Sequence, residues 1–484
     1  MSFFIRKKRG GRNADAISNH SRKRKTGDRK SQQLTEKKKK HFEDEEIESE
    51  SDEEDVRQPG KPTKEATSDE EEEDEETAQE KKLRLTKEYL AQLAEEERKD
   101  KEGKDIDHDA ISHRLKEDVL EQSGRLLKNV ACEYAQPAGD DLCILRGHKL
   151  AVTCLVISPD SKYIFSGSKD CSVIKWNIAT RRKEHVIHGG RKGTEDKHKG
   201  HTDHVLCMAI SSNNKYLATG GKDKIIHIWN PITCELLHTF KGHKDFISGL
   251  AFRQGTSLLF SGSHDRSVKL WNVDDFAYME TLFGHQEAIT SVDSLIRERA
   301  ITSGGGDKSI RIWKVVEESQ LVFTGHKGSI DCVKYLNEEF FFSGADDGSL
   351  ALWTLNKKRP LVVIPNAHNE SGSLANENWI SSLATLQSTD LLASAGSKDS
   401  RVRLWRAEEG CKGLRPLFDI PVVGFVNCLQ FSADGARLVA GVGQEHKLGR
   451  WWRIKEAKNS VVIIPLKKKP SNGEDRPIDE EKDK

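Results

Sequence analysis

The feature that most constrains the fold of this chain is a tryptophan that returns at near-regular intervals between residues 143 and 452. Six copies stand six residues after an aspartate, in the pairs Asp170/Trp176, Asp223/Trp229, Asp265/Trp271, Asp307/Trp313, Asp347/Trp353 and Asp399/Trp405. A Gly-His pair precedes the first five aspartates, and the sixth copy keeps only Ala367-His368. A seventh copy, Gly443–Trp452, has His446 at the aspartate position. The chain therefore repeats one structural unit seven times.

A period of about 40–45 residues with this Gly-His to Trp pattern is typical of WD-repeat β-propellers, in which each repeat supplies one four-stranded blade. In Phe260–Trp271, for example, two short apolar runs flank a polar turn that contains glycine and aspartate. That arrangement is typical of a β-hairpin. The sequence therefore predicts an all-β fold, a seven-bladed propeller over residues 141–466.

In WD-repeat proteins, which these repeats resemble, the aspartate binds the histidine, the histidine binds a serine or threonine, and this hydroxyl reaches the tryptophan nitrogen. The expected tetrads include His148, Ser166, Asp170 and Trp176 in blade 1, and His243, Ser261, Asp265 and Trp271 in blade 3. The expected hydroxyls of blades 2, 4 and 5 are Thr219, Ser303 and Ser343, whereas blade 6 has Ala395. We therefore expect blades 1 to 5 to be regular and blades 6 and 7 to be specialised.

The same pattern argues against an enzyme. A histidine near an aspartate and a serine resembles a nucleophilic triad, but an arrangement repeated around a ring is structural. The sequence has no phosphate-binding glycine loop, His-Glu-x-x-His run or Cys-x-x-Cys pair. Cys154, Cys207 and Cys332 each follow a Gly-His histidine by six residues, which predicts small core residues. We expect no catalytic residue, metal or cofactor, and a reducing intracellular environment without a membrane contact.

The formal net charge of zero hides two opposed N-terminal segments. Residues 1–40 carry 15 Lys and Arg against 3 Asp and Glu, and residues 43–76 carry 3 against 19. Such a composition predicts disorder over 1–76, and residues 467–484 form a second charged tail. The clusters Arg22-Lys23-Arg24-Lys25 and Lys37-Lys38-Lys39-Lys40 are typical of nuclear import or nucleolar retention signals.

Between the tail and the propeller, residues 77–135 are expected to be helical. Leu83, Tyr89, Leu90 and Leu93 give one apolar stripe, and Ile111, Leu115, Val119, Leu126 and Val130 give another. Neither is long enough for a stable isolated helix, so each needs a partner surface, either on the propeller or in a larger assembly.

Closure of the ring has two candidate strands. The run Leu142–Leu145 precedes the first Gly-His pair, where other copies have an outer strand, and Val461–Ile464 lies near the end of the repeats. The sequence leaves open which strand closes the ring, or whether both do.

The propeller region is basic, with 45 Lys and Arg against 35 Asp and Glu over residues 141–469. Basic clusters of this kind suit a phosphate backbone. The RNA-binding candidates are Arg181, Arg182, Arg191 and Lys192 in a long connection after blade 1, and Lys447, Arg450, Arg453, Lys455 and Lys458 in the final stretch. The candidates for a partner-binding face are Lys149, Lys169, Lys222, Lys244, Lys327 and Lys398.

The whole chain resembles the ribosomal-RNA-processing protein 9 family, the WD-repeat component of the U3 small nucleolar ribonucleoprotein. The most specific stretches are His204–Ser212, Glu318–Phe323, and Gly441–His446 continuing to Gly449–Ala457, where His446 departs from the general WD pattern.

The resemblance implies a non-enzymatic RNA-binding subunit that recognises the box B/C region of U3 small nucleolar RNA together with a kink-turn-binding protein. It also implies box C/D core proteins and the small-subunit processome as partners, a role in pre-ribosomal RNA processing, and a nucleolar location. The alternative is a protein-only WD-repeat scaffold of another nuclear complex.

Overall fold

The computed structural model describes residues 78–100, 108–137, 139–191, 193, 198–368, 378–450 and 452–469. The predicted disordered segment 1–76, both basic clusters, Lys192 and most of the C-terminal tail lie outside these residues. In the described part, no helix is long and apolar enough to cross a membrane.

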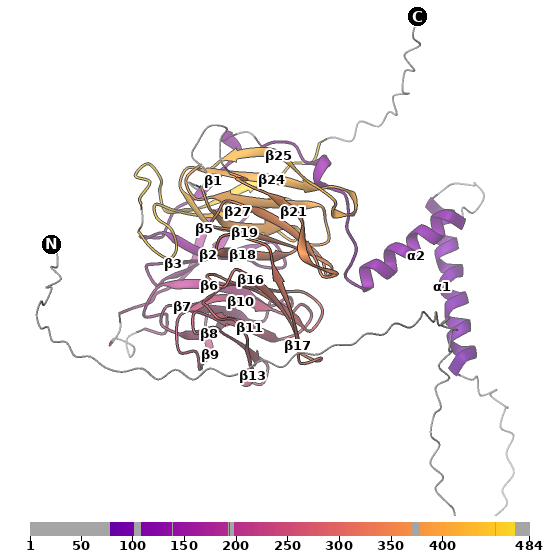
Figure 1. Ribbon diagram of the computed structural model, residues 1–484, viewed down its shortest axis with the longest axis horizontal. Coiled ribbons are helices and arrows are strands. Elements are labelled where there is room, and N and C mark those ends of the chain that lie inside the picture. The colour runs from indigo at the N-terminus through magenta and orange to yellow at the C-terminus, as the bar shows by residue number, and fades with distance from the viewer. Residues whose placement is uncertain are drawn as a thin grey trace, which may run out of the picture. The chain divides into compact units, whose positions relative to one another are not determined.

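The described residues form seven four-stranded antiparallel sheets, the blades of a propeller, as predicted. The strands labelled β2, β6, β10 and β18 lie toward the middle of this body, and β9, β13 and β17 lie at its rim (Figure 1). Blade 1 contains β2 (Val152–Ile157), β3 (Tyr163–Ser168), β4 (Val173–Asn177) and β5 (Arg182–Ile187). Blade 2 contains β6 (Val205–Ile210), β7 (Leu217–Gly221), β8 (Ile225–Trp229) and β9 (Leu236–Lys241). Blade 3 contains β10 (Ile247–Phe252), β11 (Leu258–Ser263), β12 (Ser267–Asn272) and β13 (Ala277–Phe283).

The remaining blades follow in chain order. Blade 4 contains β14 (Ile289–Ser294), β15 (Arg299–Gly304), β16 (Ser309–Lys314) and β17 (Ser319–Thr324). Blade 5 contains β18 (Ile330–Tyr335), β19 (Phe340–Ala345), β20 (Leu350–Thr354) and β21 (Lys357–Ile364). Blade 6 contains β22 (Ile380–Thr385), β23 (Leu391–Gly396), β24 (Arg401–Ala407) and β25 (Leu414–Pro421). Blade 7 contains β26 (Phe425–Phe431), β27 (Arg437–Gly443), β28 (Ser460–Pro465) and β1 (Cys143–Leu145).

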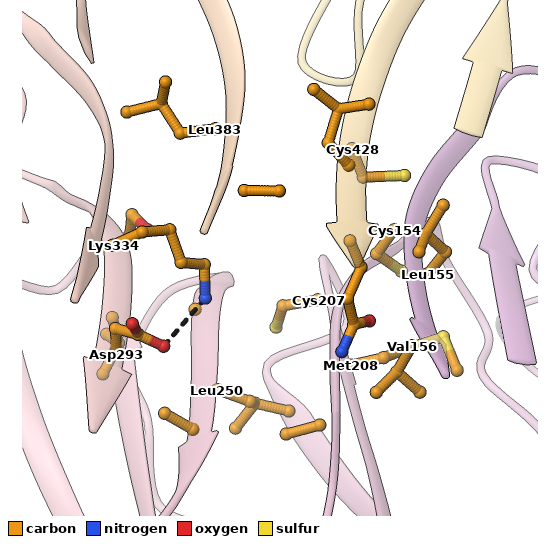
Figure 2. Close-up of a pocket in the computed structure, with 18 of the residues that line it drawn as sticks. Cys154, Leu155, Val156, Cys207, Met208, Leu250, Asp293, Lys334, Leu383 and Cys428 are labelled. Atoms are coloured by element: carbon orange, nitrogen blue, oxygen red, sulfur yellow. Dashed lines mark hydrogen bonds and ion pairs between the residues drawn. The ribbon is translucent and has the colours of Figure 1, made fainter. Parts of the chain in front are cut away.

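Both candidate closing strands take part in blade 7, where the strand order is β1-β28-β27-β26. Val461–Ile464 belongs to the third strand, β28, and the fourth strand, β1, pairs with it through Cys143 opposite Ile463 and Leu145 opposite Val461. The start and the end of the propeller therefore share one sheet. Figure 2 shows the result at the centre of the ring, where the yellow strand that carries Cys428 lies beside the purple strand that carries Cys154.

Each inner strand has a β-bulge at the same position, and most of the bulge residues link neighbouring blades. The bulge residues are Thr153, Leu206, Ser248, Thr290, Asp331, Ser381 and Asn427. Five of them donate to a backbone carbonyl of the next blade; for example, Thr290 binds the oxygen of Ile330 at 2.6 Å and Ser381 binds that of Val426 at 2.7 Å. Asn427 closes this ring of bonds by donating to Val152 at 2.8 Å. A bulge leaves the extra residue outside the ladder, which frees its side chain for this contact.

The segment before the propeller is partly helical. Helix α1 (Ala78–Asp100) and helix α2 (His108–Gln122) fall where helices were expected, and the Tyr89 hydroxyl donates to Asp118 Oδ2 at 2.6 Å. Leu126 and Val130, predicted to continue the second stripe, lie beyond the end of α2.

Residues 123–136, which we call the strap, run along one face of the propeller. The strap contacts the turns between the first and second strands of blades 5, 6 and 7: the Gly124 carbonyl accepts from Glu338 N at 2.9 Å, Lys128 N donates to Ser388 O at 2.9 Å, and the Tyr134 hydroxyl donates to Gly435 O at 3.1 Å. Asp390, fully buried, accepts from the backbone N–H groups of Val130 and Ala131 at 2.7 and 2.9 Å. Part of the segment thus packs on the propeller itself, one of the two possibilities left open.

Candidate RNA-binding surface

A hydrogen-bonded tetrad of tryptophan, hydroxyl residue, histidine and aspartate is present in each of blades 1 to 6. Trp176 Nε1 donates to Ser166 at 2.8 Å, His148 Nε2 binds the same hydroxyl at 2.8 Å, and His148 Nδ1 lies 3.4 Å from Asp170. Blade 3 repeats this with Trp271 and His243 on Ser261, and a His243–Asp265 distance of 2.9 Å. Ser166 and Ser261 are fully buried, with 0% exposure. Their hydroxyls therefore bond only within the tetrads and are not accessible to a substrate.

Two tetrad assignments made from the sequence were wrong. In blade 4 the hydroxyl belongs to Thr302, not Ser303, and in blade 6 it belongs to Ser394, not to the position of Ala395. Blade 6 is therefore regular, with His368 bonded to both Ser394 and Asp399. In blade 5, by contrast, Ser349 lies between the partners, since it binds His326 Nδ1 at 2.8 Å and donates to Asp347 at 2.5 Å.

The aspartates of the tetrads in blades 1 to 5 stay ionised, because their pKa values are lowered. Burial raises the pKa of Asp265, but hydrogen bonds from His243, Ser267 and the Lys244 N–H outweigh it and hold that pKa below the usual range. Burial also raises the pKa of Asp170, but hydrogen bonds from His148 and Ser172 outweigh this effect, and the pKa is lowered. A charged carboxylate that accepts several hydrogen bonds fixes the turn in which it lies.

One group of metal-ligating side chains gathers among the described residues, in the tetrad of blade 2. His201, Asp223 and His227 place one ligand atom each within 4.8 Å of one another. Hydrogen bonds account for this grouping, because His201 binds Asp223 and Thr219, while His227 binds Thr239 at 3.0 Å.

Blade 7 departs from the other six in the connection between its second and third strands. This connection, residues 444–459, replaces a short turn by a long segment that we call the blade-7 loop. Trp452, which the sequence pattern placed in a strand, lies in this loop, and the third strand is β28. His446 is also in the loop and is buried against Phe425 and Trp379. Burial lowers the pKa of His446 to about 3, so its ring is neutral.

The blade-7 loop is anchored to its neighbours through Glu445. This buried carboxylate accepts from Lys169 Nζ of blade 1 at 2.9 Å and pairs with Arg450 of its own loop. Lys169 is 5% exposed, so the structure removes it from the expected partner-binding face. The Asn459 amide donates to the Lys149 carbonyl at 3.1 Å, which places the loop on the face that carries the Gly-His pairs, here called the Gly-His face.

Four of the five basic candidates in the blade-7 loop are exposed: Arg450, Arg453, Lys455 and Lys458. Arg453 is oriented by Gln444, whose amide oxygen accepts from its Nε at 3.0 Å. The fifth, Lys447, lines the central channel instead. The loop thus presents several cations that share one anchored segment.

The central channel has a volume of about 950 Å³ and is lined by the inner strands. Figure 2 shows Cys154, Cys207 and Cys428 around it, with Lys334 Nζ bonded to Asp293 at 2.8 Å. Burial raises the pKa of the Cys154 thiol to about 12, so this group stays protonated. The channel cysteines are packing residues, as predicted for Cys154, Cys207 and Cys332, all three of which are buried.

The described basic candidates after blade 1 lie at the two ends of one strand. The sequence suggested a long connection, but Arg182 begins strand β5, the outer edge of blade 1. Arg181 and Arg182 lie at its start and Arg191 follows its end, so a strand of about 20 Å separates them. Exposed cations on an edge strand also prevent pairing with another chain.

The remaining lysines of the expected partner face are exposed on the Gly-His face: Lys149, Lys222, Lys244, Lys327 and Lys398. Sequence reasoning missed two exposed cations that connect neighbouring blades on the same face. Lys224 Nζ donates to the Lys244 carbonyl at 2.7 Å, and Arg266 Nη1 donates to the Gln286 carbonyl at 3.4 Å. Lys224 and Arg266 occupy the left-handed positions of their turns, with φ of 68° and 69°.

Comparison with known proteins agrees with this architecture. The family described as "WD domain, G-beta repeat" matches residues 139–177, 194–230, 234–272, 277–314, 317–354 and 369–406. It covers the six regular repeats and stops before blade 7.

Three similar proteins cover most of the chain. The mouse protein named U3 small nucleolar RNA-interacting protein 2 is 61% identical over 395 residues, 81% of this chain and 83% of the relative. The human protein of the same name is 60% identical over the same shares. A solved structure titled "Crystal structure of RRP9 WD40 repeats" has a TM-score of 0.66 and 56% identity, covering 69% of this chain and 100% of the other. The chain therefore belongs to the ribosomal-RNA-processing protein 9 family.

Proposed function

We propose that the protein is a non-enzymatic subunit of the U3 small nucleolar ribonucleoprotein, and that it binds U3 small nucleolar RNA through the Gly-His face of its propeller. The observation that carries this proposal is the blade-7 loop, which presents Arg450, Arg453, Lys455 and Lys458 from an anchored segment. Two relatives at 60% identity or more are named for an interaction with this RNA.

The finer expectation is that the RNA element is the box B/C region already carrying a kink-turn-binding protein, next to the box C/D core proteins. A broad face with exposed lysines on several blades suits such composite recognition, because folded RNA is read through shape and phosphates. Lys222 lies in the turn between the second and third strands of blade 2, and Lys244 and Lys327 lie in the connections that precede blades 3 and 5. All three are exposed on this face and are available to the protein component. The proposed role is in pre-ribosomal RNA processing within the small-subunit processome, in the nucleolus.

The proposal is tested by ultraviolet crosslinking in cells, followed by sequencing of the bound RNA and mass spectrometry of the crosslinked peptides. We expect U3 reads centred on box B/C and crosslinked peptides from residues 444–459. The competing assignment, a protein-only scaffold of another nuclear complex, predicts a specific protein partner and background RNA. That result, with the propeller intact, would overturn the proposal.

A further inference from the structure

An aromatic cluster underlies the blade-7 loop and is separate from the tetrads. Trp452 lies 4.6 Å from Trp379 of blade 6 and 5.3 Å from Phe425 of blade 7, measured between ring centroids. His446 packs against both Trp379 and Phe425. The rings come from three segments that are far apart in the sequence, so the fold itself assembles this cluster.

Trp452 is held differently from the tryptophans of the six regular blades. In each regular blade the indole N–H donates to a tetrad hydroxyl, as Trp405 does to Ser394 at 2.8 Å. The Trp452 N–H is buried and has no hydrogen-bond partner among the described residues. Packing therefore fixes the ring, and an unsatisfied donor carries a free-energy cost that a purely structural residue would avoid.

The outer side of the Trp452 ring is marked by a cation. Lys398 Nζ lies 4.7 Å from the ring centroid, and Lys398 is an exposed residue. Because an ammonium remains close to water, this side of the indole is the one that opens to solvent. Phe425 and Trp379 also pack against the ring.

The chemistry of the surroundings selects the ligand. A cluster of aromatic rings can bind a cationic group, but Lys398, Arg450 and Arg453 make a second cation unfavourable here. A ligand with a flat aromatic face and a negative backbone fits both the ring and the charges. We propose that Trp452 is a stacking platform for one unpaired RNA base, which displaces the Lys398 ammonium onto the adjoining phosphate. This inference rests on the proposed RNA-binding function and assigns a site within it.

The test compares three full-length proteins: the natural chain, Trp452→Leu and Trp452→Phe. Each is titrated with an eight-nucleotide single-stranded RNA and with the same sequence as a blunt duplex. Stacking on an aromatic side chain is worth about 5- to 150-fold in affinity per base. We expect Trp452→Leu to lose that factor for the single strand. Trp452→Phe keeps an aromatic ring and should lose less, and both variants should keep their affinity for the duplex.

A second measurement does not depend on any variant. RNA carrying one 5-bromouridine, irradiated on the natural protein, should attach to residue 452, as mapped by mass spectrometry. Unchanged single-strand affinity in Trp452→Leu, or crosslinks only elsewhere, would overturn the inference and leave RNA binding by the propeller in place. Equal losses for single strand and duplex together with a lower melting temperature would also overturn it, since they indicate a structural role. Absence of any RNA binding by the natural protein would instead defeat the proposed function, and the inference with it.

Discussion

Asp331 is the one bulge residue among the seven whose side chain becomes charged, and it makes the stability of blade 5 dependent on pH. Thr153, Ser248, Thr290, Ser381 and Asn427 each donate to the next blade at this position. A carboxylate has no proton to donate, whereas a carboxylic acid does. The protonated form of Asp331 therefore fits the ring of bonds, and the ionised form does not.

The size of the effect follows from the pKa of this carboxyl. Burial raises the pKa of Asp331 from 3.8 to about 7, against the opposing influence of Lys447, while nearby Asp346 adds to the rise. Because the folded pKa lies above the unfolded one, the folded state binds the proton more tightly. The stabilisation is complete below the unfolded pKa and is lost as pH rises through the folded one. Each pH unit in this window removes about 1.4 kcal/mol, or about 4 kcal/mol in total.

The measurement is urea unfolding of the natural protein and of Asp331→Asn at pH 5 and pH 7. Asparagine supplies a permanent donor, as Asn427 does in blade 7. The natural protein should lose about 2 kcal/mol more unfolding free energy than the variant between these two pH values. All other titrating groups are shared by the two proteins, so the difference in pH dependence reports Asp331. Identical pH dependence in the natural protein and Asp331→Asn would refute the reasoning.

Three further predictions concern the tetrads, the strap and the cysteines. Ser394→Ala and Ser261→Ala should each lower the unfolding free energy by about 1–3 kcal/mol, because both leave a buried histidine and tryptophan without a hydrogen-bond partner. A much smaller loss in urea titration at Ser394 would show that blade 6 does not depend on its tetrad. Asp390→Ala should release the strap and lower the unfolding free energy by about 2–4 kcal/mol. The release should appear as rapid proteolysis within residues 123–136, and unchanged protease resistance would contradict this. Iodoacetamide should modify the exposed Cys132 in the folded protein and reach Cys154 only on unfolding; labelling of both at equal rates would disprove the burial argument.

The number of blades and most of the tetrads could be predicted from the sequence, because the repeat carries its own register. The two wrong hydroxyls have a simple cause. In blades 4 and 6 the tetrad hydroxyl and the tryptophan are separated by 11 residues, against 10 in blade 1. The turn is one residue longer there, so counting back from the aspartate gives Ser303 and Ala395 in place of Thr302 and Ser394.

Other features depend on contacts between distant residues and carry no local signal. Lys169 stands beside a turn like Lys222, but only Lys169 meets a buried carboxylate, Glu445, from the far end of the chain. The position of Trp452 was misread because Gly443–Trp452 imitates a repeat, whereas the apolar run of β28 supplies the strand. The apolar run of β28 could have indicated the third strand of blade 7, because the repeat pattern supplies no other apolar run for it.

The central claim, that the blade-7 loop neutralises RNA phosphates, is tested most directly by the salt dependence of binding. The natural protein and a variant with Arg453, Lys455 and Lys458 replaced by alanine are titrated with a box B/C RNA fragment carrying its kink-turn-binding protein, over a range of salt concentrations. Lys357, Lys358 and Arg359, exposed on the outer strand of blade 5, give the matched control triple. The account predicts that the loop variant weakens binding and reduces the log–log slope by about 2 to 3, since each lost phosphate contact removes about 0.7–0.9, while the control triple changes neither. An unchanged slope in the loop variant, with the propeller folded, would contradict the account.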